Sequence, residues 1–286
     1  MNVRLRPSLL AGLAILVIAP AQTRAAGSYD NCNNFIDSLP AVISTQGVWC
    51  LRKDLSTAQA SGEAIAIATN NATIDCNGFK LGGLAAGAGT QTVGISTGGR
   101  LNATVRNCTI RGFLYGLYLN GSGGHVVEDN RFEGNTYVGF LVNGDGSMVR
   151  RNQVLDTGGT TLDVLETIGI HVWDGVDVLD NTVSGVTVPN AGRVPVGIRV
   201  DGGTGSISGN RVRGLAPSGE EYGIDTQSQG NPMLVGNQLR GSGSLLPGSI
   251  GIYCGGSTQT RVKDNIIAGF LAGHDCGDAG GNDSPP

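Results

Sequence analysis

Acidic, basic and aromatic side chains stand at matching places in three segments of the second half of the sequence. His171 and Trp173 lie in IGIHVWD, Arg199 and Asp201 lie in VGIRVD, and Asp225 lies in YGIDT. Histidine titrates near neutral pH and can act as a general base, and arginine can stabilise a developing enolate. Two carboxylates can form the acid–base pair of a glycosidase or bind Ca²⁺. These residue types predict carbohydrate chemistry, provided that the fold brings the three segments together.

The three segments belong to a repeat, and the repeat predicts a solenoid. Motifs with glycine before an apolar residue recur as VGIS, YGLYL, VGFLV, IGIHV, VGIRV, YGIDT and IGIYC. A second motif, apolar-x-x-Asn-x-apolar, places one asparagine of each unit in a common column, with Cys108 in the same slot of one unit. The asparagines of this column are Asn77, Asn130, Asn152, Asn181, Asn210, Asn237 and Asn265. The unit occurs eight times, with steps of 22 to 31 residues, which is typical of a solenoid.

Each unit is too short for helices and has room for about three short strands. Apolar residues alternate along the glycine motif, as Ile170 and Val172 do, which is the period of a half-buried strand. Stacked coils place each strand beside its copy, so that alternate apolar side chains fill a shared core. The asparagine amides can then bond to the amides above and below them. We therefore interpret the column as an internal ladder and not as a set of ligands.

The coils resemble those of right-handed parallel β-helix proteins of the pectate lyase-like superfamily. The segment GVWCLRKDL…ATIDCNGFKLGG is similar to the first coils of such secreted proteins, and the resemblance extends from about Gly47 to Cys276. It implies an all-β fold, a right-handed parallel β-helix of about eight coils with an N-terminal cap. The superfamily contains lyases, hydrolases, epimerases, adhesins and phage tail proteins, so the resemblance specifies the fold and leaves the activity open.

The chain divides into four regions around one domain. Residues 1–25 are expected to be a signal peptide, because Arg4 and Arg6 precede an apolar run that ends at Ile18 and small residues follow. Residues 26–60 are expected to form the cap, residues 61–276 the β-helix, and residues 277–286 a disordered tail. The apolar run is short for a bilayer, and no later segment could span one. These features predict a soluble, secreted protein of the extracellular space or periplasm.

Six cysteines in an exported chain predict disulfides. The sequence contains no CxxC pair, so a zinc site is not predicted. Cys254 and Cys276 occupy the third slot of the glycine motif in adjacent coils, with Cα atoms expected ~4.8 Å apart, so we predict a bond between them. Cys32–Cys50 and Cys76–Cys108 are two further candidate pairs among about 15 possible connectivities.

Strand alternation directs a set of polar and aromatic side chains outward. One outward column contains Tyr118, His171, Arg199, Asp225 and Tyr253, and the next contains Trp173 and Asp201. The inserted segments DTGGTTLDVLET, GVTVPNAGRVP, GLAPSGEE and GSGSLLPGS precede the glycine motifs of successive coils. They are expected to form loops that wall this face and make it a groove. Tyr118, Trp173 and Tyr253 would stack on sugar rings.

Two hypotheses from different classes follow. In the first, the protein binds and cleaves an extracellular polysaccharide. As a hydrolase it would use Asp201 and Asp225, expected ~8 Å apart as in inverting glycosidases. As a lyase it would transfer protons with His171 and Arg199, while the two aspartates hold a Ca²⁺ ion. The catalytic motifs of polygalacturonases are mostly absent, and Gly273-His274-Asp275 is the nearest echo of one. The D-P-H motif of alginate epimerases is missing, and no lysine is expected in the groove.

In the second hypothesis the protein is a non-catalytic glycan-binding, adhesin-like or structural surface protein. Apart from the Ca²⁺ ion of the lyase hypothesis, no metal or other cofactor is predicted. A net charge of −4 without a basic stripe argues against nucleic acid as the main partner.

Overall fold

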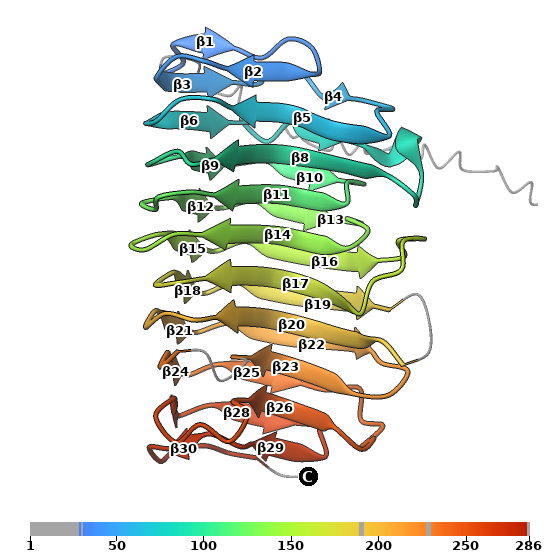
Figure 1. Ribbon diagram of the computed structural model, residues 1–286, viewed down its shortest axis with the longest axis vertical. Helices are drawn as coiled ribbons and strands as arrows, with labels where there is room; N and C mark the ends of the chain where they lie inside the picture. The colour runs from blue at the N-terminus through green and yellow to red at the C-terminus, as the bar shows by residue number, and fades with distance from the viewer. Residues whose placement is uncertain (1–28, 30, 189–191, 227–229, 285–286) are drawn as a thin grey trace, which may run out of the picture.

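The computed structural model describes residues 29, 31–188, 192–226 and 230–284. The predicted signal peptide, residues 1–25, lies outside the described residues. The described chain winds into a solenoid of about eight coils whose strands form three parallel sheets, called here sheets A, B and C (Figure 1). Among the described residues, no helix has the length and apolar character needed to cross a membrane.

Each coil passes through sheet B, then sheet A, then sheet C. Sheet B contains β2 (Ala41–Ile43), β5 (Ser61–Ile67), β8 (Gln91–Gly98), β11 (Tyr115–Asn120), β14 (Val138–Asn143), β17 (Glu166–Trp173), β20 (Val194–Asp201), β23 (Glu221–Asp225), β26 (Ser249–Tyr253) and β29 (Ala272–His274). Sheet A contains β1 (Asn34–Phe35), β3 (Gly47–Cys50), β6 (Ala72–Asp75), β9 (Thr104–Arg106), β12 (Val126–Glu128), β15 (Met148–Arg150), β18 (Asp177–Leu179), β21 (Ser206–Ser208), β24 (Met233–Val235), β27 (Arg261–Lys263) and β30 (Gly277–Asp278). Sheet C contains β4 (Leu55–Ser56), β7 (Lys80–Gly82), β10 (Thr109–Arg111), β13 (Arg131–Glu133), β16 (Gln153–Gly158), β19 (Thr182–Thr187), β22 (Arg211–Ala216), β25 (Gln238–Arg240) and β28 (Ile266–Ala268). A short 3₁₀ helix, η1 (Leu84–Ala86), follows β7.

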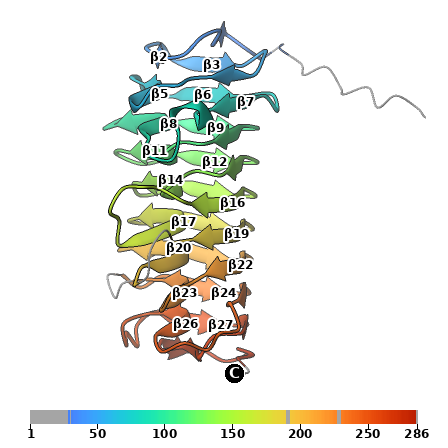
Figure 2. The ribbon, with the colours of Figure 1, turned by 90° about the vertical axis from the view of Figure 1, so that its right-hand side faces the viewer.

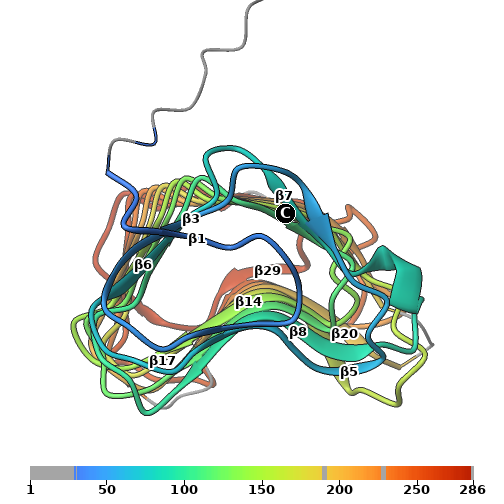
Figure 3. The same cartoon turned by 90° about the horizontal axis from the view of Figure 1, so that it is seen from above.

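The apolar core runs along the axis between the three sheets, and sheet B curves inward toward it (Figure 3). Ile170 and Val172 of β17 are fully buried in this core, as the alternating pattern predicts. The position before the first inward apolar residue, such as Gly169 before Ile170, also faces the core, and it has no room for a side chain. A Cβ atom on Gly169 would lie 2.5 Å from Val183 Cγ1 and 2.6 Å from the carbonyl oxygen of Gly197. The glycine at this position therefore leaves room for the Val183 side chain of sheet C against the backbone of sheet B.

The asparagine ladder is confirmed from Asn130 onward. The side-chain oxygen of Asn130 accepts from the Cys108 backbone N–H. In each later coil the side-chain oxygen accepts from the backbone N–H and the side-chain amide of the asparagine one coil earlier, at Asn152, Asn181, Asn210, Asn237 and Asn265. The prediction for Asn77 is wrong. Residues 76–79 connect β6 to β7, whereas only residues 107–108 connect β9 to β10, so Asn77 lies outside the column and donates to the Leu51 carbonyl. Asn282 extends the ladder beyond Asn265.

All three predicted disulfides are present. Cys254–Cys276 joins adjacent coils with Cα atoms 5.2 Å apart, and Cys32–Cys50 and Cys76–Cys108 join the first coils. The predicted disorder of residues 277–286 is wrong for its described part. β30 pairs with β27, and Asn282 bonds to Asn265, because the tail supplies one more layer over the end of the core.

The predicted cap and loops are partly strand. β1 to β4 of the predicted cap occupy the first places in all three sheets. In sheet C, β16, β19 and β22 continue through the first residues of the insertions, pairing Thr157 with Val186 and Val186 with Leu215. The remainder of the first insertion runs back toward earlier coils (Figure 2), where Thr161 N donates to the Ala88 carbonyl.

Candidate functional site

The predicted outward column exists on sheet B. Register pairs Tyr118 with Leu141, Leu141 with His171, His171 with Arg199, Arg199 with Asp225, and Asp225 with Tyr253. The second column pairs Trp173 with Asp201. We name this surface the sheet B face and define it by the outward side chains of β11, β14, β17, β20, β23 and β26. All seven predicted catalytic and substrate-binding residues lie on it.

A buried ion cluster occupies the middle of the sheet B face. Arg199 Nη2 lies 2.7 Å from Glu166 Oε1 and 2.9 Å from Asp225 Oδ2. The side chains of Arg199 and Asp225 are 7% and 1% exposed, whereas that of Glu166 is 26% exposed. Burial lowers the pKa of Arg199, but the charges of Asp225 and Glu166 outweigh it and raise this pKa above its ordinary value. Arg199 therefore remains charged and paired with both carboxylates.

The burial of the cluster follows from its neighbours on the same face. Val138, Ile168 and Val196 form a second, smaller apolar cluster on the outer side of sheet B, and each is at most 2% exposed. Tyr137 and Val194 pack against them. The salt bridge from Arg199 to Asp225 is therefore shielded from water, and Asp225 is not an exposed carboxylate.

His171 contacts two predicted site residues of the second column. Its Nε2 lies 2.8 Å from Asp201 Oδ2 and 2.6 Å from Trp173 Nε1. A single ring nitrogen cannot donate to the carboxylate and accept from the indole at the same time. We assign the proton to Nε2, donating to Asp201, because a carboxylate is the stronger acceptor. The indole N–H of Trp173 then donates to Asp201 as well and not to the histidine ring. This tautomer leaves the lone pair on Nδ1.

Asp201 stays ionised in this arrangement. Burial raises its pKa, but the hydrogen bond from His171 and the positive charge of Arg199 outweigh burial and hold the pKa below its ordinary value. The Asp201 and His171 side chains are 29% and 12% exposed, so both remain accessible. The structure thus joins His171 to Asp201 and joins Arg199 to Asp225, and it places the two aspartates in different pairs.

Aromatic side chains lie at both ends of the charged residues. On the N-terminal side, Tyr115 contacts Tyr118 and Tyr137 edge to face, with ring centroids 5.5 and 5.4 Å apart. On the C-terminal side, Tyr222 stacks on Tyr253 at 4.9 Å. Burial raises the pKa of Tyr115 and of Tyr222, so these phenols stay neutral and present apolar ring surface.

Three residues of the site, Tyr115, Glu166 and Tyr222, were not among the predicted site residues. For the two tyrosines the repeat itself contained the information needed to predict them. Tyr115 and Tyr222 directly precede the glycine in YGLYL and YGIDT, so they share a register position on the outer side. Glu166 precedes the corresponding position by two residues, inside a segment predicted to be loop.

Acidic groups outnumber basic groups on and beside the sheet B face. Carboxylates are contributed by Glu63, Glu166, Asp201, Glu220 and Asp225, against Arg199 and His171. Glu63 accepts from the Ser96 hydroxyl, and Glu220 accepts from the Tyr222 hydroxyl. The loop residues Arg193 and Asp163 neutralise each other. The face therefore has an excess of negative charge.

The residues present do not fit a calcium site. Ca²⁺ takes six to eight oxygen ligands, whereas Asp225 faces a guanidinium and Asp201 faces a histidine N–H. In the described part of the chain, one group of candidate metal-binding side chains is found, Cys254, Asp275 and Cys276, and its two sulfurs form a disulfide.

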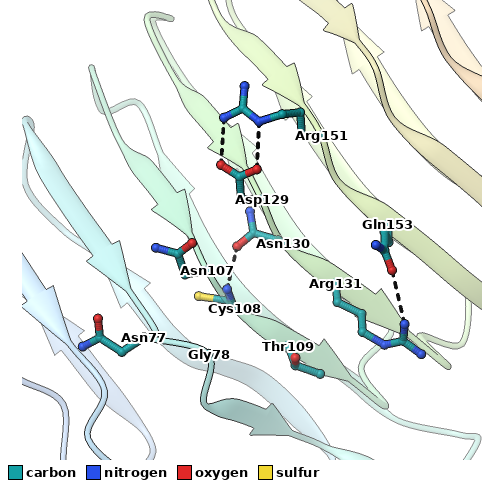
Figure 4. Close-up of a pocket in the computed structure, with 10 residues that line it drawn as sticks. All are labelled: Asn77, Gly78, Asn107, Cys108, Thr109, Asp129, Asn130, Arg131, Arg151 and Gln153. Atoms are coloured by element: carbon teal, nitrogen blue, oxygen red, sulfur yellow. Dashed lines mark hydrogen bonds and ion pairs between the residues drawn. The ribbon is translucent and has the colours of Figure 1, made fainter. Parts of the chain in front are cut away.

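A cavity of about 590 Å³ lies away from sheet B, where sheets A and C meet (Figure 4). Its charged walls are already paired. Arg151 binds Asp129 through two nitrogens, at 2.8 and 2.7 Å, and Arg131 donates to Gln153 and Glu133. The predicted site residues do not line this cavity, and its paired side chains favour a structural role.

One comparison with known proteins gives a match. A family model described as "Right handed beta helix region" matches residues 41–190, more than half of the chain. The match runs from β2 to just past β19 and includes Tyr118, His171 and Trp173. Comparisons with curated proteins and with solved structures return no match.

Proposed function

Because the chain belongs to the right-handed β-helix family, we propose that it binds an extracellular polysaccharide along the sheet B face. One observation carries the proposal: tyrosines lie at both ends of a polar cluster that extends over consecutive coils. Tyr118 lies on β11 and Tyr253 on β26, five strands further along the sheet. Neighbouring strands are ~4.8 Å apart, so the face extends over ~24 Å and suits an extended chain.

The charges of the face favour a neutral or amino-bearing glycan over an acidic one. Arg199 is already paired with Glu166 and Asp225, so it is not placed to receive a substrate carboxylate. The remaining carboxylates repel anions and attract amines at distances within the Debye length. Tyrosine rings and the exposed edge of Trp173, which is 36% exposed, can pack against the apolar faces of sugar rings.

Binding can be tested with purified protein and a panel of neutral, amino-bearing and acidic glycans. Truncating an aromatic anchor commonly costs more than about 1 kcal/mol, so Trp173→Ala and Tyr253→Ala should each weaken binding by about fivefold or more. Met233→Ala is the control, because Met233 is an exposed apolar residue on sheet A. Equal affinities for the parent and both aromatic variants would exclude the sheet B face as the binding site.

A second candidate function is cleavage of the bound glycan by the His171–Asp201 pair. The 2.8 Å contact favours it, because a carboxylate that holds one ring nitrogen fixes the tautomer of a general base. His171 Nδ1 would then accept a proton from water or from a sugar carbon. Neither Asp225 nor Arg199 is assigned a catalytic role in this proposal, since both are buried in a salt bridge.

Cleavage is tested by following unsaturated products and reducing ends together. An enzyme should lose turnover in His171→Ala and Asp201→Asn while keeping glycan affinity. If the parent protein binds glycan and releases neither product, the non-catalytic, adhesin-like function holds.

The proposed compartment is the cell exterior or periplasm, and the proposed wider relationship is to pectate lyase-like proteins. Three disulfides support export, because such bonds persist in oxidising compartments. Expression of the full chain followed by N-terminal sequencing of the exported protein should give a first residue near position 26. Retention of residues 1–25 in the cytosol would contradict export.

A further inference from the structure

Three exposed arginines on sheet C have no ionic partner among the described residues. Arg211 and Arg213 lie on β22, and Arg240 lies on β25. None of the three side chains forms a hydrogen bond or salt bridge within residues 29, 31–188, 192–226 and 230–284. Four arginines earlier on the solenoid, Arg106, Arg131, Arg150 and Arg151, each bind a carboxylate. Among the described residues Arg100 and Arg111 form no salt bridge either, so the inference rests on the clustering of Arg211, Arg213 and Arg240 and not on the lack of pairing alone.

Register places two of the unpaired arginines side by side. Arg211 pairs with Gln238 and Val212 with Leu239, so the next pair along these strands is Arg213 with Arg240. Neighbouring strands lie ~4.8 Å apart, and like charges directly opposite each other destabilise a sheet. The other neighbours of this pair are Ser184 and Ala268, which carry no charge. The repulsion is therefore not relieved by an acidic side chain on either adjoining strand.

A cavity of about 370 Å³ lies between these side chains. Its lining includes Arg211, Arg213, Gln238, Arg240, Ile266 and Ala268, and no carboxylate lines it. Ile266 is 52% exposed, so the cavity combines guanidinium groups with an open apolar surface. We name it the arginine cavity. Arg211 also lines a separate cavity together with the carboxylate of Asp180. The inference therefore depends on Arg213 and Arg240, whose cavity has no acidic side chain among its described lining residues.

The contrast with the cavity in Figure 4 shows what is unusual here. There Arg151 is held by both oxygens of Asp129, and Arg131 is held by Gln153 and Glu133, so their N–H groups are already used. In the arginine cavity the corresponding N–H groups of Arg213 and Arg240 have no partner in the described protein. A guanidinium presents its donors in a fork that matches carboxylate and sulfate oxygens.

We propose that the arginine cavity binds an acidic polysaccharide, with Arg213 and Arg240 holding one carboxylate or sulfate group between them. Ile266 and Ala268 then contact the apolar face of the adjoining sugar ring. Arg211 lies two residues from Arg213, ~6.7 Å along the strand, and reaches the next charged group of the chain. Mixed apolar and guanidinium lining favours a sugar polymer over a chain of phosphates alone.

This site lies on sheet C and does not rest on the function proposed for sheet B. The linear sequence gave no basic stripe, because Arg213 and Arg240 are separated by a whole coil and become neighbours only through the register. The protein as a whole has a net charge of −4, so its attraction to polyanions must come from a local surface.

The test compares the double variant Arg213→Gln/Arg240→Gln with the control Arg52→Gln/Arg131→Gln. Each removes two exposed arginines and changes the net charge equally, but Arg52 and Arg131 are paired with Asp37 and Glu133. Affinities are measured for polygalacturonate, dextran sulfate, uncharged dextran and single-stranded DNA at about 0.15 M salt, where charges are screened beyond about 8 Å.

We expect the parent to bind polygalacturonate or dextran sulfate more tightly than uncharged dextran. The double variant should bind about tenfold more weakly or worse, because charge-assisted hydrogen bonds are lost, whereas the control should stay within about twofold of the parent. Trp173→Ala should keep this binding, which separates the site from the sheet B face. The melting temperature of the double variant should equal or exceed that of the parent, since like charges are removed.

Three outcomes overturn the proposal. They are equal losses in the two double variants, tighter binding of single-stranded DNA than of either acidic glycan, and absence of acidic-glycan binding by the parent. The single variant Arg213→Gln provides the same comparison if the double variant does not fold.

Discussion

Arg199 and Asp225 form a salt bridge of 2.9 Å on the outer side of sheet B, and both side chains are nearly inaccessible to water. Outward residues of a solenoid strand are usually solvated, so burial at this position depends on the covering residues of the neighbouring coils. The pair lies in the middle of the sheet B face, between Tyr118 and Tyr253 of the same column. It holds β20 and β23 in register and keeps Glu166 beside them through the second contact of Arg199.

Breaking this pair should destabilise the fold. Asp225→Asn removes the charge that opposes a buried guanidinium, and removing one partner of a buried pair costs about 3–5 kcal/mol. The loss in the free energy of unfolding should fall near the lower end of this range, because Glu166 remains as a partner of Arg199. Urea denaturation measures it. Asp163→Asn is the control, since the Asp163 side chain is 86% exposed and its pairing with Arg193 is worth less than about 1 kcal/mol. Similar losses in the two variants would contradict this account.

The asparagine ladder should be equally sensitive to a single truncation. Asn181 accepts from the backbone N–H and side-chain amide of Asn152, and its own amide donates to the Val149 carbonyl and to Asn210. Asn181→Ala leaves buried polar groups without partners, each at a cost of about 1–3 kcal/mol. We expect a total loss of about 3 kcal/mol or more in denaturant unfolding.

Asn143→Ala is the matched control for the ladder. Asn143 also donates to an asparagine one coil earlier, Asn120, but it lies half-buried on the outer side of sheet B. Water can replace that bond, so the loss should stay below about 1 kcal/mol. A small effect for Asn181→Ala would show that the ladder is not a source of stability.

The repeat allowed most of this architecture to be predicted, and the failures have local causes. Strand period placed His171, Arg199 and Asp225 in one column, and that column exists. The prediction for Asn77 failed because its coil has a longer connection from sheet A to sheet C. The burial of Asp225 could not be predicted from the sequence, because it depends on how residues from other coils cover the outer face. Strand period also directs Arg213 and Arg240 outward, but their contact emerges only from the register.

His125 should make the fold sensitive to mild acid. It is fully buried, and its Nδ1 accepts from the Ala103 N–H at 3.2 Å. Burial lowers the pKa of His125, so the folded protein keeps the ring neutral, whereas the unfolded chain takes up a proton near pH 6.5. The unfolded state then binds more protons than the native state. The stability contribution is complete above about pH 6.5 and is lost as the pH falls toward the lowered pKa.

The free energy of unfolding measured between about pH 7 and 5 should therefore decrease in the parent. In His125→Asn the side-chain oxygen can still accept from Ala103, but the residue does not titrate, so this part of the pH dependence should disappear. An unchanged pH profile in the variant would assign the acid sensitivity to other groups.

Gly169 should not tolerate even a methyl group. It faces the core at the point where sheets B and C approach, and a Cβ atom would lie 2.5 Å from Val183 Cγ1 and 2.6 Å from the Gly197 carbonyl oxygen. Real Cβ atoms do not approach other atoms so closely, so Gly169→Ala must displace β17 or the side chain of Val183. Overpacking of this kind costs about 1–3 kcal/mol, and displacement of β17 should also weaken the contact of His171 with Asp201.

Gly98→Ala is the control, because Gly98 ends β8 with open space at its Cβ position. Melting temperatures measure both changes, and we expect a clear decrease for Gly169→Ala and none for Gly98→Ala. Equal melting temperatures for Gly169→Ala and the parent would mean that the close approach of sheets B and C does not require glycine at this position of the motif.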